Sequence, residues 1–176
     1  ATANASDLTV CDGDLVDLTS SPSSPSGTIL TEDFNGVAPG WSTVNLSTGG
    51  TPANAAWTLR PNGYMPWTGI AFSSNDASQF YLTDSDDQGS GSTTRVQLIS
   101  PVMDLTNFTT ANLSFWHHYD DIGSDDTARV EVSTNGGASW AIVQTYNTDQ
   151  GLRNAFANAN VDLSAFVGQS TVQFRF

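Results

Sequence analysis

The sequence contains no lysine, one cysteine and only two glutamates. Five arginines accompany sixteen aspartates and these two glutamates, and the formal net charge is −13. Nucleic acid and anionic membrane surfaces carry charge of the same sign, so we expect neither as a partner. A single cysteine excludes a disulfide within the chain. The acidic neighbours of Cys11 disfavour the thiolate that a catalytic nucleophile needs.

Long apolar runs are also missing. None approaches the roughly 20 residues of a membrane span, and no basic-then-apolar signal peptide opens the chain. We therefore expect no membrane insertion, and a mature secreted fragment has this appearance. The chain is poor in Glu and Lys but rich in Thr, Ser, Asn, Asp, Gly and Val, which predicts strands and turns rather than helices.

Two regions differ in composition. Residues 1–27 end in the Ser/Pro stretch "SSPSSPSG", which is typical of a linker or a long loop. Before it, "LTVCDGDLVDLTSS" predicts two short strands around the turn "DGD". Residues 28–176 are long enough for one well-packed main domain.

Residues 28–176 alternate between short apolar runs and turn signals, which predicts an antiparallel sandwich of roughly nine strands. The predicted strands are "TILTEDF", "AAWTLR", "SQFYLTD", "TRVQLISPVMDL", "ANLSFWHHY", "TARVEVS", "SWAIVQTY", "ANVDLSAFVG" and "TVQFRF". Only "LRNAFANAN", residues 152–160, is expected to form a helical turn or two.

The run "TARVEVS" shows the two-residue period most clearly. Apolar and polar side chains alternate along it, with Ala128, Val130 and Val132 on one face and Arg129, Glu131 and Ser133 on the other. We expect the valines to be buried between the sheets together with Leu113 and Phe115. The following "STNGGASW" contains residues that tolerate positive φ, which predicts a tight hairpin to the strand from Trp140.

The stretch "FWHHYDDIGSDD" concentrates two histidines and four aspartates in ten residues. Consecutive side chains of a strand point to opposite faces, so His117 and His118 are not expected to bind one metal ion. The alternation places His117 on the inner face, and His118 on the other face with Trp116. A zinc site or histidine catalysis therefore has little support.

The four aspartates, Asp120, Asp121, Asp125 and Asp126, have another interpretation. Calcium takes six to eight hard oxygen ligands, and such clusters repel one another unless a cation lies among them. The spacing is not that of an EF-hand, so a calcium site would combine several loops. A solvated acidic turn is the alternative.

Four phrases, in their order and spacing, resemble the jelly-roll domains of the cleaved-adhesin type: "TEDFNGVAPGW", "SNDASQFYL", "LISPVMDLTNFTTANLSFWHHYD" and "DDTARVEVSTNGGASW". Such domains occur in the adhesin regions of gingipains and in multidomain bacterial proteins exported by the type IX system, and MAM domains share their sandwich. The similarity covers about residues 29–176. Residues 1–27 look like a remnant of an immunoglobulin-like repeat or a linker.

The resemblance implies a two-layer antiparallel jelly-roll β-sandwich that binds calcium and is secreted or displayed on the cell surface. By motif, the implied calcium ligands are Glu32 and Asp33 in "EDFNG", Asp76 before "QFYL", and Asp125 and Asp126 before "ARVEVSTNGG". The family continues past "VQFRF" into a strand of the form W-A-I-D-x-V, whereas this sequence stops at Phe176. We therefore expect an excerpt that lacks its last strand, with one sheet edge uncovered.

Exposed aromatic rings are the features expected to bind a glycan, because flat Trp and Tyr faces stack on sugar rings while polar side chains bond the hydroxyls. The candidate patch is "LRPNGYMPWTG", which contains Arg60, Asn62, Tyr64 and Trp67 in a loop broken by prolines and glycines. The alternative is that Tyr64 or Trp67 closes the end of the sandwich.

Two functions follow from these features. The first is a non-catalytic adhesion or carbohydrate-binding module whose partner is an extracellular glycan or a surface protein. The second is a structural spacer or protein-interaction module in a repetitive surface adhesin. We do not expect an enzyme, because the chain has no G-x-S-x-G elbow and calcium or solvent explains its aspartate pairs.

Overall fold

The structure, a computed structural model, describes residues 2–5, 18–21, 25–36, 38–66, 69–123 and 125–176. These residues form eleven β-strands and three short 3-10 helices, η1 (Pro52–Ala55), η2 (Asp86–Gln88) and η3 (Ser164–Phe166). Within these ranges no helix has the length and apolar character needed to cross a membrane. The predicted all-β class is confirmed.

Five strands form the larger sheet, in the order β3-β6-β11-β8-β9. Their bounds are β3 Ser42–Asn45, β6 Val96–Ile99, β11 Gln173–Arg175, β8 Ala128–Ser133 and β9 Ala141–Tyr146. Every neighbouring pair is antiparallel. The C-terminal strand β11 lies between β6 and β8, so the sheet joins segments that are far apart in the sequence.

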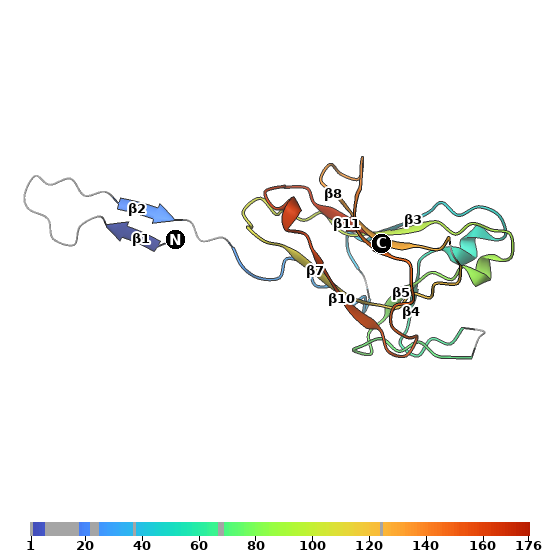
Figure 1. The fold of residues 1–176 in the computed structure, drawn as a ribbon. Coiled ribbons are helices and arrows are strands. Elements are labelled where there is room, and N and C mark those ends of the chain that lie inside the picture. The colour runs from blue at the N-terminus through green and yellow to red at the C-terminus, as the bar shows by residue number, and fades with distance from the viewer. Residues whose placement is uncertain (1, 6–17, 22–24, 37, 67–68, 124) are drawn as a thin grey trace, which may run out of the picture.

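The second layer consists of two strand pairs. β7 (Asn112–His117) pairs with β10 (Ala157–Asp162), and β4 (Thr58–Arg60) pairs with β5 (Phe80–Leu82), both antiparallel. Figure 1 shows the β7–β10 pair separated from β8, β11 and β3. Among the described strands β7 pairs with β10 alone, so its other edge has no neighbour. That a further strand belongs to the domain stays a prediction.

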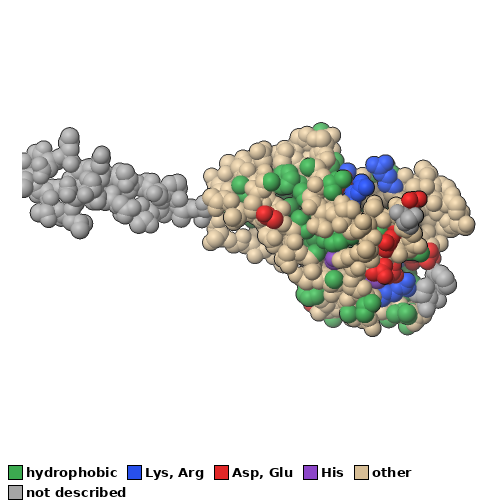
Figure 2. Space-filling model, viewed as in Figure 1, with side chains coloured by type: hydrophobic (Ala, Val, Ile, Leu, Met, Phe, Trp, Pro, Cys, Tyr) green, Lys and Arg blue, Asp and Glu red, His purple; other side chains and the backbone are tan. Residues whose placement is uncertain are grey.

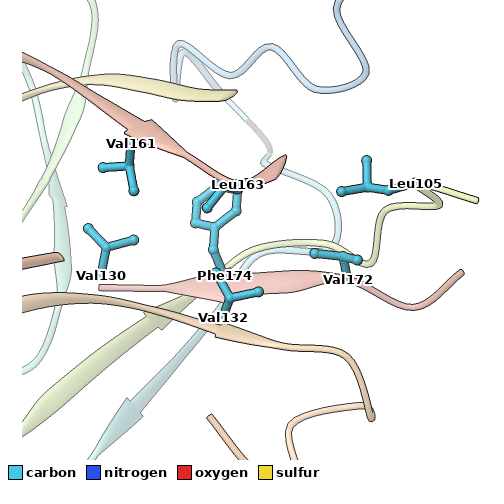
Figure 3. Close-up of a cluster of buried hydrophobic side chains, with 7 residues drawn as sticks. All are labelled: Leu105, Val130, Val132, Val161, Leu163, Val172 and Phe174. Atoms are coloured by element: carbon cyan, nitrogen blue, oxygen red, sulfur yellow. The ribbon is translucent and has the colours of Figure 1, made fainter. Parts of the chain in front are cut away.

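The core lies between the layers. Val130 and Val132 of β8 are 0% and 1% exposed, and they face Val161 and Leu163 on the β10 side (Figure 3). Leu113 and Phe115 are partly buried and pack against this cluster. The predicted register of β8 and β7 is therefore correct, since the two valines, Leu113 and Phe115 all point inward.

His117 also lies on this inner face. Its ring contacts Phe115 and Tyr146, with centroid distances of 5.1 Å and 4.7 Å. Burial, and then the neighbouring His118, lower the pKa of His117. His117 is therefore a packed residue of the sandwich interior, as the alternation along β7 predicts.

The β8–β9 hairpin confirms the predicted turn, in which Gly136 and Gly137 have φ values of 69° and 84°. The prediction that Ser133 faces solvent is wrong, since it is 1% exposed. Its Oγ accepts hydrogen bonds from the backbone N–H groups of Asn135 and Gly137, at 3.3 Å and 2.9 Å. Ser133 is therefore buried because its hydroxyl hydrogen-bonds the backbone of the turn, and it is not part of the solvent-exposed face.

Three strand predictions need correction. Residues 28–34 form no strand, because β pairing needs a neighbour and the carboxylates of Glu32 and Asp33 instead accept the backbone N–H groups of Phe34 and Asn35. Strand β3, in "WSTVN", was not predicted. The helical turns expected at residues 152–160 are also wrong, since a tight turn at residues 152–155 leads into β10.

The N-terminal region contains β1 (Thr2–Ala5) and β2 (Leu18–Ser21), which pair antiparallel in a sheet of their own. The "DGD" turn and Cys11 lie outside the described residues. The boundary between residues 1–27 and 28–176 stays a prediction.

We predict that Gly151→Ala is far more destabilising than Gly136→Ala. Both glycines have positive φ, at 63° and 69°. A Cβ on Gly151 would lie 2.6 Å from the backbone nitrogen of Ala157 and 2.9 Å from the carbonyl oxygen of His117, whereas a Cβ on Gly136 meets nothing within 4 Å. The control should lose only the roughly 1 to 2 kcal/mol that the left-handed conformation costs. Urea unfolding measures the loss of stability in each variant, and equal losses in the two variants would contradict the close approach at Gly151.

We also predict that His117 makes stability depend on pH. Because its pKa is lowered in the folded protein, the unfolded chain takes up a proton first as the pH drops below about 6.5, and stability falls. The loss between about pH 7.5 and pH 5 should be smaller in His117→Gln than in the wild type. Urea unfolding at both pH values measures it, and identical losses would contradict the prediction.

Candidate functional site

An open cavity of about 400 Å³ lies beside the unpaired edge of β7. Its wall is largely aromatic and combines rings from both layers, including Trp41, Trp57, Phe80, Phe115, Trp116 and Phe176. The indole nitrogens of Trp41 and Trp57 and Nδ1 of His118 are buried without a hydrogen-bond partner. All three belong to residues of this wall, so it combines apolar surface with unused polar groups.

Three of the predicted calcium ligands, Glu32, Asp33 and Asp76, line this cavity. Each carboxylate accepts a backbone N–H two residues further along the chain, at 2.8 Å, 2.9 Å and 3.0 Å respectively. Hydrogen bonds from the Ser78 side chain and backbone lower the pKa of Asp76. Backbone strain accompanies these turns, since Phe34 and Ala77 have positive φ.

The other two predicted ligands, Asp125 and Asp126, lie in the loop between β7 and β8 and do not line this cavity. Burial, followed by the charges of Asp121, Asp126 and Asp149, raises the pKa of Tyr119. Asp149 also accepts the backbone N–H of Asp121 at 2.8 Å. The structure thus places Asp126 with carboxylates from two loops, around one tyrosine.

Asp149 was not considered from the sequence, because "NTDQG" contains a single acidic residue in an ordinary turn. The Tyr119–Gln150 bridge and the Asp121–Asp149 hydrogen bond bring this turn beside the Asp120–Asp126 loop. Asp121 was recognised as an oxygen donor but not chosen as a ligand. Its Oδ1 is buried and has no hydrogen-bond partner.

Neither the carboxylates that line the cavity nor the aspartates near Tyr119 form a complete metal-binding site from side chains alone. Across the described ranges, no three His, Cys, Asp or Glu side chains come together in a way that could hold a metal ion. A calcium ion at either place would therefore need amide, carbonyl or water oxygens as well.

His118 follows the end of β7 and is packed among aromatic rings rather than exposed beside Trp116. Its ring lies beside Phe72 and stacks on Phe156, with centroid distances of 5.6 Å and 6.4 Å. Its Nε2 lies 3.4 Å from Asp120 Oδ2, which Arg153 also contacts at 3.3 Å. On the face shown in Figure 2, acidic side chains gather beside arginine and histidine side chains. His117 and His118 both contribute to the lining of the cavity, and their rings pack against different aromatic neighbours.

The predicted glycan patch is largely occupied by its own contacts. The Arg60 guanidinium lies over the Tyr64 ring, 4.4 Å from its centroid, and Tyr64 is half-buried. The side-chain oxygen of Asn62 accepts the backbone N–H of Ser74 at 3.0 Å. Trp67 lies outside the described residues. One face of Tyr64 is therefore covered, as it would be if this residue closed the end of the sandwich.

The tryptophans differ in exposure. Trp41 and Trp57 are half-buried in the cavity wall, and Arg175 covers the Trp140 ring at 4.3 Å. Trp116 is 50% exposed, and it is the only aromatic residue among the exposed large hydrophobic residues of the described chain. The alternation along β7 predicts the outward position of Trp116, but nothing in the sequence alone marks it as a binding residue.

Comparisons with known proteins support the fold. No protein-family model matches the chain, and no curated protein matches it. The chain is similar to the K1 cleaved adhesin domain of Lys-gingipain from Porphyromonas gingivalis W83, with a TM-score of 0.53 and 22% sequence identity over 85% of this chain and 88% of that one. At this identity the likeness establishes the fold alone. The chain is a two-layer antiparallel jelly-roll β-sandwich of the kind seen in that adhesin domain.

Proposed function

We propose that the chain is a non-catalytic, calcium-binding adhesion or carbohydrate-binding module of a secreted or cell-surface bacterial protein. The observation that carries the proposal is the similarity of fold, over most of both chains, to a domain described as a cleaved adhesin domain. The partner is an extracellular glycan or a surface protein. An exposed tryptophan and a largely aromatic cavity support a binding role.

Calcium has two candidate places on the molecule. At the cavity rim, Glu32, Asp33 and Asp76 supply carboxylates, and the Asn35 side chain bonds both Asp33 and the backbone of Gln79. Oxygen donors of several kinds are thus close together, which suits the flexible coordination of calcium.

Around Tyr119, the donors are Asp121, Asp126 and Asp149. Here the unpartnered buried Oδ1 of Asp121 is the supporting observation, because a buried carboxylate oxygen without a donor is costly unless a cation neutralises it. Asp125, next to Asp126, is exposed and completes the set predicted from the sequence.

We predict that calcium raises the melting temperature and that EDTA lowers it again. An ion that binds only the folded state, at a concentration 100 times its dissociation constant, adds about 2.7 kcal/mol. For a domain of this size that corresponds to roughly 5 to 10 °C. Melting curves in calcium and in EDTA measure the shift, and magnesium serves as the control ion. Coincident wild-type curves would contradict calcium binding.

Two matched variants locate the ion. Asp76→Asn and Asp126→Asn each remove one charge, one from the cavity rim and one from the Tyr119 cluster, with little change in volume. The variant that loses the calcium-dependent shift identifies the site, and the other serves as its control. A shift retained in both variants would contradict the involvement of both aspartates.

The choice between a carbohydrate-binding module and a structural spacer needs a direct binding test. We predict that the chain binds at least one polysaccharide on a glycan array, because its exposed aromatic surface is suited to stacking on sugar rings. The same array in EDTA tests whether calcium contributes. If the chain binds no glycan on the array when calcium is present, carbohydrate binding is contradicted and the spacer or protein-interaction function is favoured.

A further inference from the structure

The outer face of the β7–β10 pair has an unusual composition for a strand surface. In β7 the outward residues are Asn112, Ser114 and Trp116, and in β10 they are Asn158, Asn160 and Asp162. All six are exposed. Asparagine is disfavoured in strands, where Thr or Val would pair better. Folding alone therefore does not explain three asparagines on one face.

The pairing register brings these side chains together across the two strands. Asn158 lies opposite Trp116, Asn160 opposite Ser114, and Asp162 opposite Asn112. The backbone N–H of Leu163 bonds the carbonyl of Ala111, so the hydrogen-bonded pairs of this ladder are those whose side chains point inward. The outward pairs are the non-hydrogen-bonded ones, whose Cα atoms lie closer together.

The amides are held in place by one another. Asn112 Nδ2 donates to Asn160 Oδ1 at 3.3 Å, Asn160 Nδ2 donates to Asn158 Oδ1 at 2.9 Å, and Asn158 Nδ2 donates to Ser114 Oγ at 3.3 Å. Asn158 Nδ2 also donates to the carbonyl oxygen of Phe115 at 3.4 Å, so both of its hydrogens are used. Asn112 and Asn160 each keep one amide hydrogen, and the amide oxygens keep lone pairs, for a ligand. Because their orientations are already fixed, less conformational entropy is lost on binding.

Trp116 lies at the end of this amide row, and its side chain is half in solvent. From Asn112 to Trp116 the strand advances four residues, or about 14 Å. An aromatic ring beside a row of fixed amides can stack on one sugar ring while the amides bond hydroxyls of the next. The face is thus long enough for a short oligosaccharide.

Charge selects among possible ligands. Of the six outward residues only Asp162, at the far end from Trp116, is ionisable. The chain as a whole has a net charge of −13, which repels acidic polysaccharides. The net charge therefore disfavours an anionic glycan, and a basic partner would find only one carboxylate on this face with which to form an ion pair, so a neutral glycan suits the face best.

We propose that the outer face of the β7–β10 pair is the glycan-binding site, with Trp116 as the stacking residue, Asn112, Asn158 and Asn160 as hydroxyl-bonding residues, and a neutral polysaccharide as the ligand. This inference rests on the proposed carbohydrate-binding function. It replaces the Tyr64 loop as the location of the site, because Arg60 already covers the Tyr64 ring.

The test is affinity electrophoresis in native gels that contain β-glucan, xylan or galactomannan, with polygalacturonate as the acidic comparison. The wild type should be retarded by at least one neutral polymer. Trp116→Ala should weaken binding to that polymer by about tenfold or more, as expected for a stacking residue. Ile142→Ala, which removes a side chain of similar exposure from β9, should leave binding unchanged.

Asn160→Thr separates binding from folding. Threonine is the better strand residue, so the melting temperature should stay the same or rise while binding to the neutral polymer falls. Loss of binding without loss of stability is the result that supports the proposal. If Asn160→Thr and Trp116→Ala bind the polymer as well as the wild type does, while Tyr64→Ala loses binding, the site is not on this face. The carbohydrate-binding function would still stand. Retardation by polygalacturonate alone would also overturn it. A wild type that no polymer retards would overturn this site and the carbohydrate-binding part of the proposed function.

Discussion

The alternation of side chains along β7 and β10 is the constraint on which the rest of the structure depends. The same register that turns Phe115 and Val161 toward the core turns Trp116 and Asn158 toward solvent. It also gives the two neighbouring histidines different surroundings, His117 among Phe115 and Tyr146 and His118 among Phe72 and Phe156. A shift of one residue would bury the amides and expose the core, so packing of the interior fixes the outer face as well.

The sequence predicts best where one strand carries a clean two-residue period. Val130 and Val132 show this, because the alternation of polar and apolar residues along their own strand is enough to predict that they are buried. It predicts poorly where pairing comes from elsewhere in the chain. Residues 28–34 have strand composition but no strand neighbour, whereas "ANANVD" pairs as β10 although its outward positions are asparagines. Ser133 fails for a related reason, since the turn that buries it forms only after the hairpin closes.

In the candidate sites, too, the sequence predicts local properties better than contacts between distant parts of the chain. The kinds of ligand atom are visible in the sequence, which is why Glu32, Asp33 and Asp76 were chosen and do line one cavity. The grouping is not visible, because the loops that carry Asp121 and Asp149 come together only in the fold, through the Tyr119–Gln150 bridge and the hydrogen bond from the Asp121 N–H to Asp149. Exposure is likewise a tertiary property: Tyr64 and Trp140 are covered by arginines, while Trp116 is not.

The scarcity of positive charge connects these features. Two of the five arginines form ion pairs within the described part of the chain, Arg153 with Asp120 and Arg175 with Glu131, and there is no lysine to neutralise the remaining acids. Carboxylates that lie close together in loops repel one another, and this repulsion is reduced either by a bound cation or by exposure to solvent. On the β7–β10 face the chain uses amides where charged side chains would be usual. A strip that is uncharged apart from Asp162 can approach a neutral polymer without electrostatic cost, whereas the acidic chain around it repels anionic polymers.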